Sequence, residues 1–225
     1  MTVERPDVRE GYDLWAKTYD TTPNPLVSMD RRHTVGFFAP RSGEHLLDAA
    51  CGTGSHTGEM LRRGSKPVGL DVSYGMLQTT RQKYPQVPLV RADLADRLPF
   101  QEQRFDGVLC ALVGEHLEDL SLLFREFSGV LSPGGRIVFS VFHPELAAAG
   151  IESNFESDGK EYRLGAYRHT VADYLGAIED SGFRDLECYE FRGDGHLVEE
   201  IPWAAKYAER PLLLIIRAQK AGWAT

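Results

Sequence analysis

The chain has 225 residues with 25 basic and 33 acidic side chains, so its formal net charge at pH 7 is −8. This excess of negative charge argues against nucleic acid as the main partner, because it repels a phosphate backbone. The sequence has no apolar run near the roughly 20 residues that a membrane span needs, and its first residues lack the pattern of a signal peptide. We therefore expect a cytoplasmic protein that does not associate with a membrane. The length fits a single domain over residues 1–225.

Strand-like and helix-like segments alternate between about residues 45 and 140. Apolar strands are predicted at 44–50, 67–72, 87–93, 105–112 and 136–142. Helices are expected from a glycine turn to Arg63, from Ser73 to about Tyr84, and over 120–131, where apolar residues recur at helical spacing. Strands separated in this way are typical of βαβ units, so the pattern predicts an α/β fold with a parallel sheet covered on both faces.

The last third of the chain has a different pattern. Residues 143–169 show no clean period and many polar groups, so a lid or substrate-binding segment is expected over 143–170. A capping box at Thr170 and Asp173 predicts a helix. Two late strands, 186–192 and 212–218, are expected to form an antiparallel edge, and the segment 193–210 between them is the second expected substrate or lid segment.

A D-x-A-x-G-x-G motif at residues 48–54 lies at the first strand-to-helix junction. Gly52 and Gly54 let the backbone approach a ligand, and the next helix points its free N–H groups toward it. The motif completes no dinucleotide fingerprint, because the third glycine is replaced by Thr57 or Ser55, depending on the register. An NAD-dependent oxidoreductase is therefore disfavoured, and an amino acid with an attached adenosine is the alternative ligand.

Two further aspartates support an adenosine ligand. Asp71 ends the second strand, where a carboxylate accepts hydrogen bonds from two ribose hydroxyls. Asp93 ends the third strand, where it is a candidate acceptor for the amine of adenine. Because the carboxyl ends of parallel strands meet at one sheet edge, these residues and the glycine loop are expected to form one site.

Five sequence blocks, in this order and spacing, resemble class I S-adenosylmethionine-dependent methyltransferases, in the subgroup that includes ubiquinone/menaquinone-biosynthesis methyltransferases. The blocks are LLDAACGTGSHT (46–57), GLDVSYGML (69–77), RADLADRLPF (91–100), FDGVLCALVGEHLED (105–119) and LSPGGRIVFSVF (131–142). The opening GYDLWAKTYD (11–20) extends the similarity. One departure is Ala50, where many members have glycine.

The resemblance implies a Rossmann-like, doubly wound, mostly parallel seven-stranded sheet with an antiparallel edge strand. It also implies an N-terminal cap over about 1–40 and a cofactor-binding core over 41–142. The expected cofactor is S-adenosylmethionine, with S-adenosylhomocysteine as its product. The residues expected to bind it are Tyr12, Tyr19, Asp48, Ala50, Cys51, Gly52, Gly54, Asp71, Val72, Met76, Asp93 and Leu94.

Cys51 lies inside the glycine loop and is interpreted as a small packed residue, since no basic partner is near it in sequence. The three cysteines, Cys51, Cys110 and Cys188, are odd in number and widely spaced. That spacing favours reduced thiols over a disulfide frame or a metal cage, so no metal site is expected.

Catalytic residues are harder to assign, because methyl transfer from a sulfonium mainly needs alignment and desolvation. A base is required only where the acceptor must lose a proton. His116 follows the fourth strand and His143 the fifth, so both are candidates, together with Glu115.

The expected function is methyl transfer to a small molecule, with oxygen or nitrogen preferred over carbon as the acceptor atom, by a monomer or homodimer. Three alternatives remain open. They are aminopropyl transfer, a cyclisation that uses bound cofactor, and a non-catalytic cofactor-binding subunit.

Overall fold

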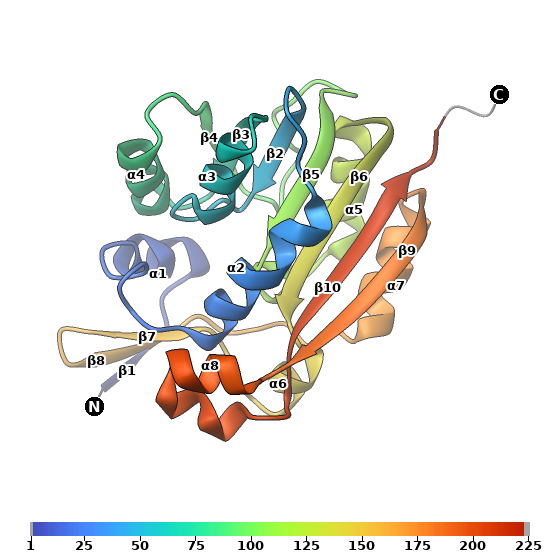
Figure 1. Cartoon of the computed structure of the whole chain (residues 1–225). Helices are drawn as coiled ribbons and strands as arrows, with labels where there is room; N and C mark the ends of the chain where they lie inside the picture. The colour runs from blue at the N-terminus through green and yellow to red at the C-terminus, as the bar shows by residue number, and fades with distance from the viewer. Residues whose placement is uncertain (1, 223–225) are drawn as a thin grey trace.

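A seven-stranded sheet in the order β4-β3-β2-β5-β6-β10-β9 organises the computed structural model, which describes residues 2–222 (Figure 1). Its strands are β2 (His45–Ala49), β3 (Lys66–Asp71), β4 (Leu89–Arg91), β5 (Phe105–Ala111), β6 (Leu131–Phe142), β9 (Phe183–Arg192) and β10 (Pro211–Lys220). The run from β4 to β6 is parallel, whereas β10 is antiparallel to both β6 and β9. The predicted α/β class and seven-stranded sheet are confirmed, and the antiparallel strand lies one place inside the edge.

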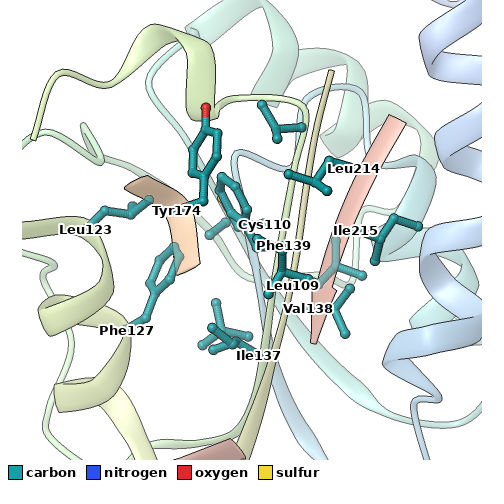
Figure 2. Close-up of a cluster of buried hydrophobic side chains, with 14 of the residues drawn as sticks. Leu109, Cys110, Leu123, Phe127, Ile137, Val138, Phe139, Tyr174, Leu214 and Ile215 are labelled. Atoms are coloured by element: carbon teal, nitrogen blue, oxygen red, sulfur yellow. The ribbon is translucent and has the colours of Figure 1, made fainter. Parts of the chain in front are cut away.

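The core forms where helices pack on the central strands. Helix α5 (Leu120–Val130) buries the predicted apolar stripe, which includes Leu123 and Phe127. In Figure 2 these side chains lie beside Phe139 of β6 and Tyr174 of α7 (Val171–Asp180). The recurrence of apolar residues at helical spacing therefore correctly predicted the buried face of α5.

Local capping signals behave as the sequence predicts. Ser73 begins α4 (Tyr74–Lys83) by accepting a hydrogen bond from the backbone N–H of Met76. Thr170 and Asp173 form the expected capping box at the start of α7. Helix α3 (Ser55–Arg62) follows the glycine loop and has no side-chain cap at its N-terminus.

The predicted irregular segment 143–170 contains regular structure. A short helix, α6 (Pro144–Ala148), is followed by the antiparallel pair β7 (Asn154–Ser157) and β8 (Lys160–Arg163). The N-terminal strand β1 (Thr2–Glu4) pairs with β8, giving a second sheet in the order β1-β8-β7. This pairing joins segments about 160 residues apart in sequence, which no local pattern signals.

Helix α2 (Pro25–Phe38) packs across the sheet against β5, β6 and β10 (Figure 1). The remaining elements are α1 (Val8–Trp15), the 3-10 helices η1 (Gly114–His116) and η2 (Pro202–Tyr207), and α8 (Gly195–Glu200). The expected segment 193–210 thus folds as two short helices. Within residues 2–222, no helix has the length and apolar character needed to cross a membrane.

Candidate functional site

A cavity of about 380 Å3 lies at the carboxyl ends of β2, β3, β4 and β5. This volume falls in the range of small-molecule sites, roughly 300–1,000 Å3. The residues that line it are Asp7, Val8, Arg9, Tyr12, Tyr19, Ala50, Gly52, Leu70, Asp71, Val72, Met76, Ala92, Asp93, Leu94, Ala95, Ala111, Leu112, Val113, His116 and Leu117. The sheet edge therefore brings together nine of the twelve residues predicted to bind cofactor.

The glycine loop forms one wall of the cavity. Gly52 has a φ of +53°, and a Cβ added there would meet no atom within 4 Å, so its backbone faces open space. Gly54, at a φ of +82°, lies outside the cavity wall, and a Cβ there would approach Thr80 at 2.9 Å. Ala50 adopts a φ of +59°, a left-handed conformation that favours glycine, at the position where many members of the family carry glycine.

Asp71 stands at the end of β3 with 8% of its surface exposed. Its two carboxylate oxygens accept hydrogen bonds of 2.8 Å from the backbone N–H groups of Gly52 and Ser73. Burial raises the pKa of Asp71 to about 6, although these two backbone hydrogen bonds favour the charged form. Each oxygen keeps a further lone pair for a ligand donor.

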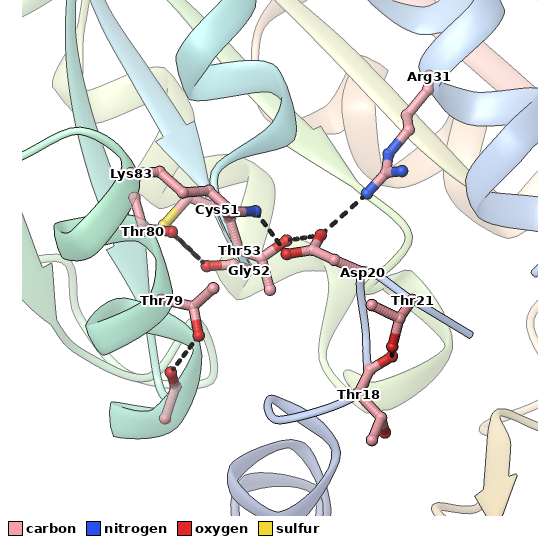
Figure 3. A network of polar contacts seen from close by, with 11 residues as sticks. Thr18, Asp20, Thr21, Arg31, Cys51, Gly52, Thr53, Thr79, Thr80 and Lys83 are labelled. Atoms are coloured by element: carbon pink, nitrogen blue, oxygen red, sulfur yellow. Dashed lines mark hydrogen bonds and ion pairs between the residues drawn. The ribbon is translucent and has the colours of Figure 1, made fainter. Parts of the chain in front are cut away.

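A polar network ties the N-terminal segment to the glycine loop (Figure 3). The carboxylate of Asp20 accepts hydrogen bonds from the Thr53 hydroxyl at 2.8 Å and from the ammonium group of Lys83. It also receives a 3.2 Å hydrogen bond from Arg31. Burial opposes ionisation of Asp20, but the hydrogen bonds from Lys83 and Thr53 lower its pKa, so a carboxylate holds the loop in place.

Two of the predicted residues lie behind the loop. The buried carboxylate of Asp48 accepts a hydrogen bond from the Thr57 hydroxyl, and burial raises its pKa. Cys51 is buried, and burial together with the charge of Asp71 raises its pKa, so it remains a thiol. Neither residue lines the cavity, which agrees with the interpretation of Cys51 as a packed residue.

A buried ion pair links α2 to α3, the helix that follows the glycine loop. The Asp30 carboxylate contacts His56 of α3 and also accepts hydrogen bonds from the hydroxyls of Thr34 and Ser140. Burial opposes charge on both partners, yet the charge of His56 lowers the pKa of Asp30, and Asp30 raises the pKa of His56. The pair joins α2 to α3 and β6.

Other lining residues of the cavity are those predicted to bind the adenine ring. Val72, Met76 and Leu94 contribute apolar side chains, and the latter two are buried. Asp93 is exposed, and its carboxylate accepts a 2.9 Å hydrogen bond from the backbone N–H of Ala95. This part of the cavity wall therefore combines apolar side chains with one carboxylate acceptor.

Aromatic residues of the N-terminal segment cover the cavity. Tyr12 is hydrogen-bonded to His116 Nε2 at 3.0 Å, and Tyr19 packs nearby with a ring-centroid distance of 6.4 Å to Tyr12. Burial raises the pKa of both tyrosines and lowers the pKa of His116. The three side chains are therefore neutral at pH 7.

The three predicted catalytic residues occupy different places. His116 lines the cavity, and the buried Glu115 lies behind it, with 3.9 Å between Glu115 Oε1 and His116 Nε2. His143 is buried at the start of α6, where its Nδ1 accepts a hydrogen bond from the Glu145 N–H and its Nε2 lies 3.5 Å from Glu190. The structure thus places His143 away from the cofactor cavity, because its side chain faces β9.

Some lining residues were not predicted from the sequence. Leu70, Ala92, Ala95 and Leu117 are chain neighbours of predicted residues. Ala111 ends β5, and Leu112 and Val113 follow it, so the rule that located Asp71 at a strand end would also have found them. Asp7, Val8 and Arg9 begin α1 and reach the cavity only through tertiary packing, so no local signal identifies them. Within residues 2–222, no group of three or more His, Cys, Asp or Glu side chains is arranged to hold a metal ion.

Comparisons with known proteins agree with this geometry. Residues 47–139 match a family model described as a methyltransferase domain. A demethylmenaquinone methyltransferase from Streptomyces avermitilis is 33% identical over 147 residues, which are 63% of this chain and 63% of that protein. The chain therefore matches less than two thirds of the length of such relatives.

The same fold occurs in solved structures. An S-adenosylmethionine-dependent methyltransferase from Mesorhizobium loti superposes with a TM-score of 0.72 at 26% identity, over 85% of this chain and 97% of that chain. The [4+2]-cyclase SpnF is similar in fold alone, with a TM-score of 0.72 at 17% identity over 99% of this chain and 100% of that chain. These findings confirm the resemblance to class I S-adenosylmethionine-dependent methyltransferases that the five sequence blocks indicate.

Proposed function

We propose that this class I S-adenosylmethionine-dependent methyltransferase transfers the methyl group of its cofactor to a small-molecule acceptor, with S-adenosylhomocysteine as the product. The observation that carries the proposal is the pairing of Gly52, whose backbone faces open space, with the buried carboxylate of Asp71 on the same cavity. An unobstructed backbone and a carboxylate with free lone pairs match an amino acid and a ribose diol.

The cavity residues then divide into roles. Asp71 accepts hydrogen bonds from the ribose hydroxyls, and Asp93 accepts one from the adenine amine. Met76 and Leu94 pack against the purine ring. The loop around Ala50 and Gly52 lies beside the methionine part, and the uncapped N-terminus of α3 favours the nearby carboxylate. Tyr12 and Tyr19 cover the cofactor and exclude water.

The sulfonium supplies an already activated methyl group, so the protein needs to align the acceptor and remove water from it. Tyr12 and Tyr19 contribute to that exclusion because both are partly buried aromatic side chains that line the cavity. For a hydroxyl acceptor, the methyl–oxygen bond forms as the sulfonium–methyl bond breaks, and the proton must leave the oxygen. Neutral His116 is the base that we propose for this proton.

The acceptor atom is a separate question. Oxygen or nitrogen was expected from the sequence, whereas the demethylmenaquinone methyltransferase relatives favour a carbon acceptor. A carbon acceptor also requires proton loss from the methylated centre, so the same base serves both cases.

Two alternatives use the same cavity. The fold similarity to a [4+2]-cyclase favours cyclisation as the second candidate, and a cofactor-binding subunit without transfer is the third. All three predict cofactor binding, but only a methyltransferase moves label from the cofactor to an acceptor.

The proposal is tested by incubating the protein with methyl-labelled S-adenosylmethionine and a library of small metabolites. Transfer of label to an acceptor with stoichiometric S-adenosylhomocysteine is the expected result. Cofactor binding without label transfer to any compound would favour the non-catalytic or cyclase alternatives. Aminopropyl transfer is tested in a parallel incubation with decarboxylated S-adenosylmethionine, where an aminopropylated product together with 5′-methylthioadenosine would favour it.

A further inference from the structure

A second cavity, of about 390 Å3, shares helix α1 with the cofactor cavity. Tyr12 lines the first cavity and Trp15 lines the second, and their rings stack with centroids 5.8 Å apart. Both segments that were expected to bind substrate or to form a lid, 143–170 and 193–210, contribute to its walls. Leu146 and residues 151–156 come from the first segment, and Trp203 and Tyr207 come from the second.

The walls of this second cavity are mostly apolar and aromatic. Trp15 and Phe155 stack with centroids 4.9 Å apart, and Trp203 is 52% exposed at the rim. The charged residues among its described lining are Glu152 and Glu156, and none of that lining is Lys or Arg. Glu152 is paired with Arg5 at 2.9 Å and lies 3.7 Å from Arg163, so the described lining offers an anionic ligand no unpaired cation. The walls therefore favour an uncharged, flat and mostly apolar molecule.

Four buried side-chain polar atoms have no hydrogen-bond partner within residues 2–222. Two of them belong to Trp15, which lines the second cavity, and to Glu115, which is bonded to Ser153 of its wall. One is the indole Nε1 of Trp15, a donor on a side chain that is 3% exposed. The other is Glu115 Oε2, an acceptor. The Ser153 hydroxyl, on the wall of the second cavity, donates to the other Glu115 oxygen at 3.3 Å. Unsatisfied buried polar atoms are costly, so they mark positions where a ligand supplies the partner.

Glu115 lines neither cavity, but it contacts one residue from the wall of each. Ser153 connects it to the second cavity, and His116, which lines the cofactor cavity, lies 3.9 Å from Glu115 Oε1. A donor group bound to Glu115 is thereby held beside the wall that separates the two cavities.

We propose that the second cavity binds the methyl acceptor, and that this acceptor is an uncharged aromatic compound with a hydroxyl or amino group that donates a hydrogen bond to Glu115. The inference rests on the proposed methyltransferase function, because it identifies the second cavity with the acceptor. Trp15 supplies a donor to an oxygen of the same compound, and Phe155 and Trp203 pack against its ring.

The test uses calorimetric titrations of the full chain. S-adenosylhomocysteine is titrated first, and 1-naphthol, 1-methoxynaphthalene and 1-naphthoate are then titrated into the protein saturated with it. We expect 1-naphthol to bind at least fivefold more tightly than 1-methoxynaphthalene, which has no donor, and than 1-naphthoate, which is anionic.

A rim variant places the ligand in this cavity. Trp203→Ala is expected to weaken 1-naphthol binding at least fivefold and to leave S-adenosylhomocysteine affinity unchanged. Tyr189→Ala, which removes an exposed aromatic side chain from β9, is the matched control and is expected to change neither.

The possible failures are distinguishable. Normal S-adenosylhomocysteine binding with equal or tighter binding of 1-naphthoate, or with no binding of any naphthalene, would overturn the acceptor assignment alone. The acceptor assignment also fails if Trp203→Ala leaves 1-naphthol binding unchanged. Absence of S-adenosylhomocysteine binding by folded protein would instead overturn the proposed function.

Discussion

Replacing Asp71 removes a buried carboxylate that faces the cofactor cavity beside the glycine loop. In the proposed complex it accepts hydrogen bonds from two ribose hydroxyls. Hydrogen bonds to a charged group contribute about 1.5–3 kcal/mol each, so the lower value for two bonds gives about 3 kcal/mol, or roughly a hundredfold in Kd. We allow for partial replacement by water and expect Asp71→Ala to weaken S-adenosylhomocysteine binding by more than about tenfold.

The structure adds a second contribution to this loss. Asp71 also orders the loop by accepting the backbone N–H groups of Gly52 and Ser73, so its removal leaves two donors without their partner. Asp71→Asn provides one amide oxygen for one of those donors and is expected to lose less affinity than Asp71→Ala. The assay is isothermal titration calorimetry with S-adenosylhomocysteine, after thermal melting has shown that each variant folds.

Asp96→Ala is the matched control, since Asp96 is exposed and close in sequence to the lining residues Leu94 and Ala95 but does not line the cavity. Its affinity is expected to equal that of the unaltered chain. A Kd for folded Asp71→Ala within twofold of the unaltered value would refute the assignment of the ribose site.

The site and the residues that support it lead to five further predictions. Because burial raises the pKa of Asp71 to about 6 and the diol binds the ionised form, calorimetric affinity for S-adenosylhomocysteine should fall as pH drops below about 6; an equally steep fall in Asp71→Asn would exclude this cause. Asp30→Asn should lower the free energy of urea unfolding by about 3 kcal/mol, because it breaks a buried ion pair. In the unaltered chain, the stability contributed by the raised pKa of His56 should be lost as the pH rises through that pKa. The stability contributed by the lowered pKa of Asp30 should be lost as the pH falls through the pKa of Asp30. Urea midpoints that change with pH in neither direction would contradict the pairing. Ala50→Gly should change the free energy of unfolding by less than about 1 kcal/mol, because glycine removes the strain of a left-handed alanine but makes the unfolded chain more flexible. A much larger loss of stability on thermal melting would show that Ala50 is not strained. His143→Ala should lower the melting temperature through loss of a buried cap, with about 1 kcal/mol of stability, and leave turnover unchanged; a large fall in turnover would restore the sequence-based catalytic assignment.

Local patterns predicted the parts of this protein that local physics determines. The apolar face of α5, the Ser73 cap and the capping box of α7 all depend on residues within one or two helical turns, and all form as predicted. The strand-end rule located Asp71 and Asp93 on one cavity because parallel strands share a carboxyl edge.

Features that depend on contacts distant in sequence were not predictable in this way. The pairing of β1 with β8 and the placement of Arg9 on the cavity arise from packing of the N-terminal segment. His143 directly follows β6, and Asp71 is the last residue of β3. The neighbour of β6 is β10, whose other partner β9 supplies Glu190, so the His143 side chain turns toward β9. Order along the chain therefore predicted its position at the strand end but not its orientation.

Equilibrium dialysis of the full chain against labelled S-adenosylmethionine measures the central property directly. Retention of one cofactor per chain, displaced by S-adenosylhomocysteine and strongly reduced in Asp71→Ala, is the predicted result. A folded protein that retains neither compound would contradict the cofactor site and every role assigned to its residues.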